Sequence, residues 1–194
     1  MIPSAQRFID DVRAVHRDEP DLPARWQAIE PLLRQLLREP DLHAASRDWP
    51  ICHDRTNRRF TNLLFYEDPE FGFVVNGLVK DESGNTAVHD HGDSWVLYGL
   101  LEGEEVVTCF ERVDDGSIAG RAELTQTAEL RLAAGDVDVV PPRRAHKERA
   151  LSERTVAVIV RSANVGEFLR GRYDLAEGTV ELSPGPEQVP YPLG

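Results

Sequence analysis

Apolar residues near the start of the chain recur three or four positions apart, as one face of an amphipathic helix requires. This spacing runs over residues 4–17, where Ser4 is available as an N-cap, and again over residues 21–39, after which Pro40 follows. Two N-terminal α-helices are therefore predicted. Their expected role is to cover a face or edge of the following domain, or to pack against a second subunit in a homodimer.

From about Arg59 the period of the pattern changes from that of a helix to that of a strand. About eight short runs are rich in β-branched residues or alternate between apolar and polar, and Gly, Asp, Asn and Pro separate them. The runs are FTNLLFY, FGFVVNGLV, NTAVHDH, SWVLYGLL, EEVVTCFERV, RAELTQTAELRL, DVDVV and RTVAVIVRS. Strands of this number and spacing predict a mainly β fold, a sandwich or barrel of the jelly-roll kind.

The chain of 194 residues is long enough for one domain with a substantial core, and short for two. We expect a helical appendage over residues 1–45, a barrel over 46–170 and a C-terminal tail or wrapping arm over 171–194. The stretch ELSPGPEQVPYPLG, with four prolines and two glycines, is predicted to lack regular structure.

Composition narrows the possible partners. The formal net charge is −12, which disfavours nucleic acid, because binding it requires a basic surface. No apolar run approaches the roughly 20 residues that would span a membrane, and the acidic N-terminus does not resemble a signal peptide. We therefore expect a cytoplasmic protein whose two cysteines, Cys52 and Cys109, are reduced and packed.

The strongest candidate for chemistry is the sequence His89-Asp90-His91. Alternate side chains of a strand face the same way, so the two imidazoles would share one face while Asp90 points to the other. This geometry suits a metal ion. Taken alone the pattern is weak, because two ordinary surface histidines would look the same.

The surroundings of this pair resemble the first motif of the cupin superfamily, which runs G, H-x-H, often E, then G. Here Gly84 stands five residues before His89, and the pair is followed by Gly92 and a new strand that runs to Gly99, without the Glu. The second cupin motif, G, five residues, P, four residues, H, fits at Gly135, Pro141 and His146 with no gap. The resemblance covers about residues 60–162.

This resemblance implies a double-stranded β-helix, a jelly-roll barrel, with one divalent metal inside it on His89, His91 and His146. The Glu that is the fourth ligand of many cupins is absent, since its two places hold Trp95 and Val96. Three neutral imidazoles leave open coordination positions, which favours catalysis over a closed structural site. Fe(II) is the expected metal; Zn, Ni, Mn and Cu are alternatives, because imidazole count alone does not choose among them.

Among three-histidine cupins, the segment HDHGDSWVLYGLLEGEE resembles the cysteine dioxygenase, or thiol dioxygenase, group. In that group Fe(II) binds a substrate thiolate beside dioxygen, an arginine grips the substrate carboxylate, and sulfur is oxidised to a sulfinate. The resemblance therefore implies an Fe(II) dioxygenase acting on a small organic anion such as a thiol acid. The carboxylate-binding arginine lies early in that family, which makes Arg58 or Arg59 a candidate here, with a solvated turn as the alternative.

This chain departs from the group on a late strand, where the family has alternating serine, histidine and tyrosine. The stretch 155–163 has no His or Tyr, and an ungapped register puts Arg161 roughly at the place of the histidine. Arg161 is thus a further candidate for pairing with an anionic substrate. Tyr98, on the strand after the ligands, could shape the pocket, although core packing is the commoner role.

The sequence is also compatible with two other functions. One is a metal-dependent isomerase or lyase on the same barrel, in which the metal polarises a substrate oxygen. The other is a non-catalytic cupin that binds a metabolite.

Overall fold

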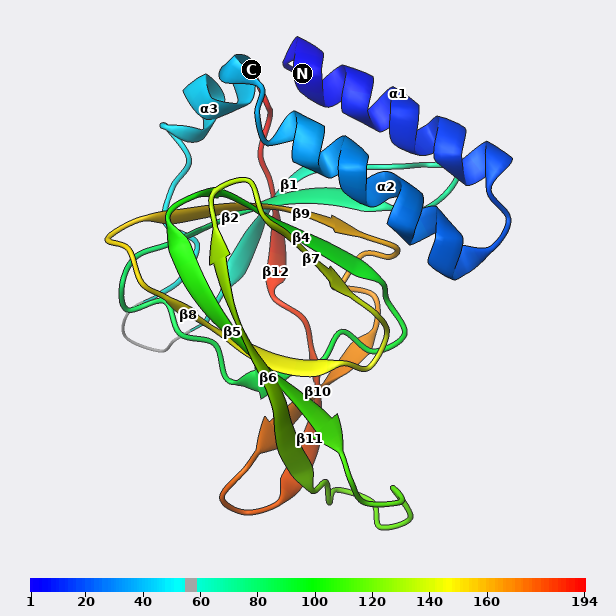
Figure 1. The fold of residues 1–194 in the computed structure, drawn as a ribbon, viewed down its shortest axis with the longest axis vertical. Coiled ribbons are helices and arrows are strands. Elements are labelled where there is room, and N and C mark those ends of the chain that lie inside the picture. Colours follow the sequence, from blue (N-terminus) through cyan, green and yellow to red (C-terminus); the bar gives the residue numbers. More distant parts are fainter. Residues whose placement is uncertain (55–58) are drawn as a thin grey trace.

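Three helices precede the β domain in a computed structural model that describes residues 1–54 and 59–194. They are α1 (Pro3–Asp18), α2 (Leu22–Leu36) and α3 (Pro40–Ser46), and they lie together on one side of the barrel (Figure 1). The two predicted helices are present, and Asp21 caps α2 by accepting from Ala24 N at 3.1 Å.

Two details of the helical prediction are wrong. Ile2, not Ser4, is the N-cap of α1, because Pro3 takes the first helical position, where its missing N–H costs nothing. Pro40 likewise takes the first position of a helix, α3, which the periodicity did not predict.

Twelve strands follow among the described residues and form two six-stranded sheets. Sheet I has the order β12-β1-β2-β9-β4-β7, and sheet II has the order β11-β10-β3-β8-β5-β6. The strands are β1 (Thr61–Glu67), β2 (Val74–Lys80), β3 (Val88–His89), β4 (Val96–Glu102), β5 (Glu104–Arg112), β6 (Leu124–Ala133), β7 (Val137–Val140), β8 (Ala145–Ala150), β9 (Thr155–Arg161), β10 (Leu169–Asp174), β11 (Thr179–Pro184) and β12 (Glu187–Pro190).

The predicted jelly roll is confirmed by the way the chain passes between the sheets. From β3 to β9 the chain crosses repeatedly from one sheet to the other, so strands distant in sequence become neighbours, as β2 and β9 do. All pairs are antiparallel except β1 with β12. The two sheets curl towards each other into a barrel (Figure 1).

Sheet I is covered on its outer face by the helices, which explains why its central strands are apolar almost without interruption. Every residue of β2 and β9 is buried, and α2 contacts β4 and β7. At Gly99 an added Cβ would lie 2.9 Å from Leu37 Cδ1, so the glycine lets the helical layer approach the sheet closely. No helix among the described residues is long and apolar enough to cross a membrane.

The prediction that residues 181–194 lack regular structure is wrong. β11 forms a hairpin with β10, and β12 runs parallel to β1. Both are edge strands that end in a proline, Pro184 and Pro190, and a strand tolerates proline at such positions because no ladder hydrogen bond is lost.

Candidate metal centre

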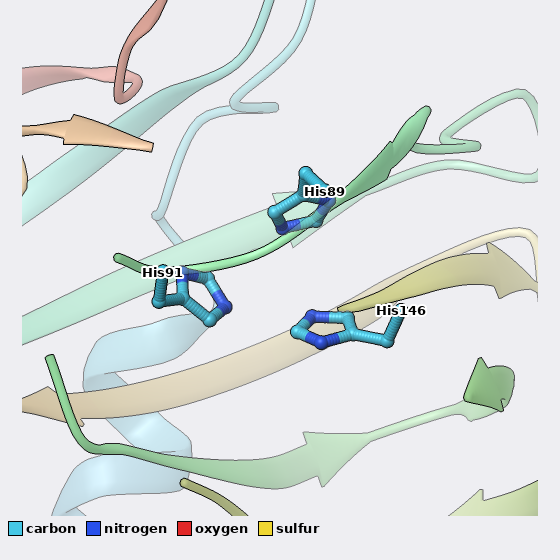
Figure 2. A group of neighbouring side chains, drawn as sticks. All are labelled: His89, His91 and His146. Atoms are coloured by element: carbon cyan, nitrogen blue, oxygen red, sulfur yellow. The ribbon is translucent and has the colours of Figure 1, made fainter. Parts of the chain in front are cut away.

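Three histidines converge inside the barrel, two from strands of sheet II and one from the segment that follows β3 (Figure 2). His89 in β3 lies directly opposite His146 in β8, and His91 follows two residues after His89. The ring centroids are 4.7 to 5.1 Å apart, and the candidate ligand nitrogens all lie within 4.8 Å of one another. All three residues are buried. This group could hold one metal ion.

Backbone carbonyls set the orientation of two of the rings. His89 Nδ1 lies 3.0 Å from Ala87 O, and His146 Nδ1 lies 3.3 Å from Arg144 O. If the Nδ1–H of His89 donates to Ala87 O, the Nε2 lone pair of that ring is left for a metal, the usual outer-sphere arrangement of a ligating histidine.

Burial favours the neutral form of two of the imidazoles, those of His89 and His91, as metal ligation requires. It lowers the pKa of His89 well below the usual range, and the positive charge of Arg170 lowers it further. Burial likewise lowers the pKa of His91, followed by the effect of His146. The donor set therefore fits a divalent transition metal.

Asp90 points to the opposite face of the ligand segment, as strand alternation predicts. Its carboxylate accepts hydrogen bonds from Gly92 N at 2.8 Å, Gly171 N at 2.9 Å and the Tyr173 hydroxyl at 2.6 Å. At Gly171 an added Cβ would lie 2.7 Å from Asp90 Oδ2, so only glycine fits. Asp90 thereby fixes β10 beside the two ligands of the first motif.

Glu148 is a buried carboxylate near the site that was not predicted from the sequence. It lies two residues after His146 on the same face of β8, with Oε1 3.2 Å from His146 Nε2, and Oε2 accepts from Thr86 Oγ1 at 2.6 Å. Burial alone would raise the pKa of Glu148, but the hydrogen bond with His146 and the nearby imidazoles hold it well below the usual range. The H-x-E alternation in AHKERA is the sequence signal for this carboxylate, and it lies outside the place of the first-motif Glu.

The three histidines open onto a cavity of about 820 Å³ between the two sheets. Sheet I contributes apolar side chains to its wall, among them Leu78, Val96 and Ile159. Polar groups, including Arg161 and Arg170, also face it. The lining is rich in polar and charged side chains beside this apolar wall, and a concave chamber with convergent polar groups is a usual form of a small-molecule site.

Arg161 is a buried cation without an acidic partner among the described residues. Its Nη1 donates to Asn76 Oδ1 at 2.7 Å, and the Asn62 amide, turned so that its oxygen faces the guanidinium, accepts at 3.0 and 3.2 Å. Burial and the nearby Arg170 lower the pKa of Arg161 to about 9. The charge is thus poorly compensated, a state that an incoming anion would relieve.

The other predicted site residues have different surroundings. Arg59 is exposed at the rim of the cavity, and Arg58 lies outside the described residues. Tyr98 lines the cavity and donates to Glu105 Oε2 at 3.0 Å, while Lys80 Nζ donates to the same oxygen at 2.9 Å. Burial raises the pKa of Tyr98 well above the usual range, so its hydroxyl stays protonated.

No protein-family model matches this chain, and no curated protein is detectably similar to it in sequence. Solved structures with cupin domains are similar at low identity. The Schizosaccharomyces pombe Cnp3 cupin domain has a TM-score of 0.41 and 10% identity, over 55% of this chain and 66% of that one. A Shewanella frigidimarina protein containing a cupin-2 domain has a TM-score of 0.40 and 17% identity, over 65% of this chain and 95% of that one.

An oxalate oxidase in complex with the substrate analogue glycolate has a TM-score of 0.43 and 15% identity. The match covers 58% of this chain and 55% of the oxidase, so the chain spans little more than half of that protein's length. Scores this low do not transfer an activity from these proteins to this chain.

Proposed function

We propose that this protein is a metal-dependent enzyme that acts on a small organic anion. The observation that carries the proposal is the combination of three converging imidazoles with the buried guanidinium of Arg161, which forms no ion pair with a described acidic group and lies on the wall of the same cavity. A structural metal site has no need of an open cavity or of an uncompensated cation beside it.

The metal that we propose is Fe(II), with Zn, Ni, Mn and Cu as competitors for the same nitrogens. Bound by His89, His91 and His146, such an ion would supply a Lewis acid with open coordination positions, and iron would add redox chemistry with dioxygen.

The chain's own residues define how a substrate would be held. Arg161 offers a fork of donors that matches a carboxylate, and it is already desolvated, so the interaction would be strong. The apolar side chains of sheet I exclude water around it. Tyr98, kept neutral by burial, offers a hydroxyl without adding charge.

As the reaction we propose oxidation of a thiol acid by dioxygen to the sulfinate. The three-histidine ligand set of a thiol dioxygenase and an arginine in the cavity support it. The test is metal analysis of protein purified without chelator, then oxygen-electrode assays of the Fe(II)-loaded protein with a panel of thiol acids. Dioxygen uptake that requires both iron and the thiol supports the proposal, and its absence across the panel contradicts the dioxygenase assignment.

Glu148 favours a second candidate, an isomerase or lyase that uses no dioxygen. A buried, ionised carboxylate within hydrogen-bond distance of a ligand imidazole is placed to take a proton from a bound substrate. Glu148→Gln keeps the shape but removes the base, and we expect kcat of such an enzyme to fall by roughly 10²-fold or more. Unchanged kcat at unchanged metal content would exclude Glu148 as the base.

A further inference from the structure

Several buried polar atoms on the cavity wall have no hydrogen-bond partner. Arg161 Nε, Arg170 Nε and Ser183 Oγ are all buried without a partner, and all three residues line the cavity. Buried polar groups are nearly always satisfied, because leaving one unpaired is costly. Three such atoms in one chamber indicate a ligand that supplies the missing acceptors.

The C-terminal hairpin aims two of these groups at the metal side of the cavity. Arg172 in β10 lies opposite His89, so Arg170, two residues before it, is on the same face as that ligand. Gly171 and Tyr173 face the other way, towards Asp90, which holds the strand in this register. Ser183 of β11 pairs directly with Arg170 across the hairpin.

The charges point to an anion as the ligand. Neither Arg161 nor Arg170 forms an ion pair with any described acidic group, although Glu148 acts on both through space. Arg161 and Arg170 line the same cavity, burial lowers the pKa of each guanidinium, and the charge of Arg170 lowers that of Arg161 further. Two neighbouring, desolvated guanidinium groups with unused donors are complementary to one oxyanion.

We propose that Arg161, Arg170 and Ser183 form one oxyanion subsite, which binds the carboxylate or phosphate group of the substrate. That the bound anion is a substrate rests on the proposed function, but the subsite itself requires no metal. Arg170 and Ser183 thereby become specificity-determining residues, contributed by a hairpin outside the two cupin-like motifs.

The experiment is calorimetric titration of the full chain, metal-free and Zn(II)-loaded, with succinate and with inorganic phosphate as separate probes. Sodium chloride at matched ionic strength is the control. We expect at least one probe to bind in both forms. Arg161→Met and Arg170→Met should each weaken that binding by about tenfold or more, the effect of losing a charge-assisted hydrogen bond.

Arg149→Met is the matched control, because Arg149 is an exposed arginine of β8 that is not among the described residues lining the cavity, so its loss should weaken binding less than about threefold, a through-space effect in high dielectric. Ser183→Ala, a milder change that keeps both charges, should give a loss of a few-fold. Circular dichroism and metal content of each variant identify any that fails to fold, and Ser183→Ala then carries the test.

Three results would overturn the subsite. Neither probe binds the wild-type protein, Arg170→Met binds as the wild type or as Arg149→Met does, or the Arg161 and Arg170 losses multiply in the double variant. Multiplication would mean that the arginines hold separate groups, since contacts to one shared group are non-additive. Oxyanion binding that depends on Arg170, without turnover of any acid, would leave the subsite standing and refute the proposed function. Turnover of an acid with the same KM in Arg170→Met and in the wild type would support the proposed function and refute the subsite.

Discussion

At the scale of single residues, the candidate site depends on histidines that no neighbour can replace. His89 and His146 are aligned by the carbonyls of Ala87 and Arg144, and their partner His91 is buried with them. A carboxylate, Glu148, lies beside one ring; of the other charged groups on the cavity wall, Arg161 and Arg170 are cations that cannot bind a metal, and Asp138 pairs with Arg144. Losing one imidazole therefore removes a ligand without supplying another.

His146→Ala should lose most of the bound metal, by about 10- to 100-fold or more in affinity, while the barrel stays folded. The fold persists because apolar strands, not the ion, make the core. Metal content and far-UV circular dichroism would be measured together, with His43→Ala in the exposed part of α3 as the control. Loss of the fold along with the metal would mean that the ion is structural.

At the scale of elements, one buried ion pair ties the two sheets together. Lys80 at the end of β2 and Glu105 in β5 have side chains that are 1% and 0% exposed, and their N···O distance is 2.9 Å. Breaking such a pair leaves a lone buried charge, which costs more than the intact pair contributes.

Lys80→Met should lower the free energy of unfolding by about 3–5 kcal/mol, because the Glu105 carboxylate is then buried unpaired. The double variant Lys80→Met/Glu105→Gln should recover most of that loss, since Gln carries no charge and can still accept from Tyr98. Urea denaturation of the three proteins measures both effects. A single variant as stable as the wild type would show that the pair is solvated in solution.

His16 of α1 packs against Phe73, the residue before β2, and its burial should make stability depend on pH. Its ring stacks on Phe73 with centroids 5.2 Å apart, and burial, followed by the charge of Arg25, lowers its pKa from 6.5 to about 4. The unfolded chain therefore binds the proton first as pH falls. The contribution of His16 is complete above about pH 6.5 and declines between pH 6.5 and 4.

His16→Phe should flatten this part of the stability profile, because no proton is then taken up on unfolding at that position. Denaturation at pH 7.5 and pH 5, with His43→Phe as the control, measures the change. An equal loss of stability on acidification in His16→Phe and the wild type would refute the assignment.

Helices and strands with a strong apolar periodicity could be predicted from the sequence. Strands that form only because a neighbouring strand pairs with them could not. The first two helices and the long strands have a clear apolar period. β11 and β12 do not, because edge strands with prolines are stabilised by their partners β10 and β1. The same holds for the site: motif spacing indicates His89, His91 and His146, whereas the approach of Arg170 depends on the register of β10.

At the scale of the whole molecule, the ligands come from segments far apart in the chain, and the folded barrel alone brings them together. An ion that binds only the folded state stabilises it by about 2.7 kcal/mol at a free concentration of 100 times Kd. For a chain of this size, Tm should then rise by roughly 5–10 °C. Differential scanning calorimetry with and without Zn(II) measures this rise, and His146→Ala should show little of it. An equal rise in that variant would place the ion elsewhere.

The central claim, that one ion binds on three imidazoles, is tested most directly by a crystal structure of the metal-loaded protein with anomalous data at the metal edge. We predict a single anomalous peak per chain, with nitrogens of His89, His91 and His146 at about 2.0 to 2.2 Å from it. A peak outside the barrel, or any one of the three rings turned away from the ion, would contradict the account.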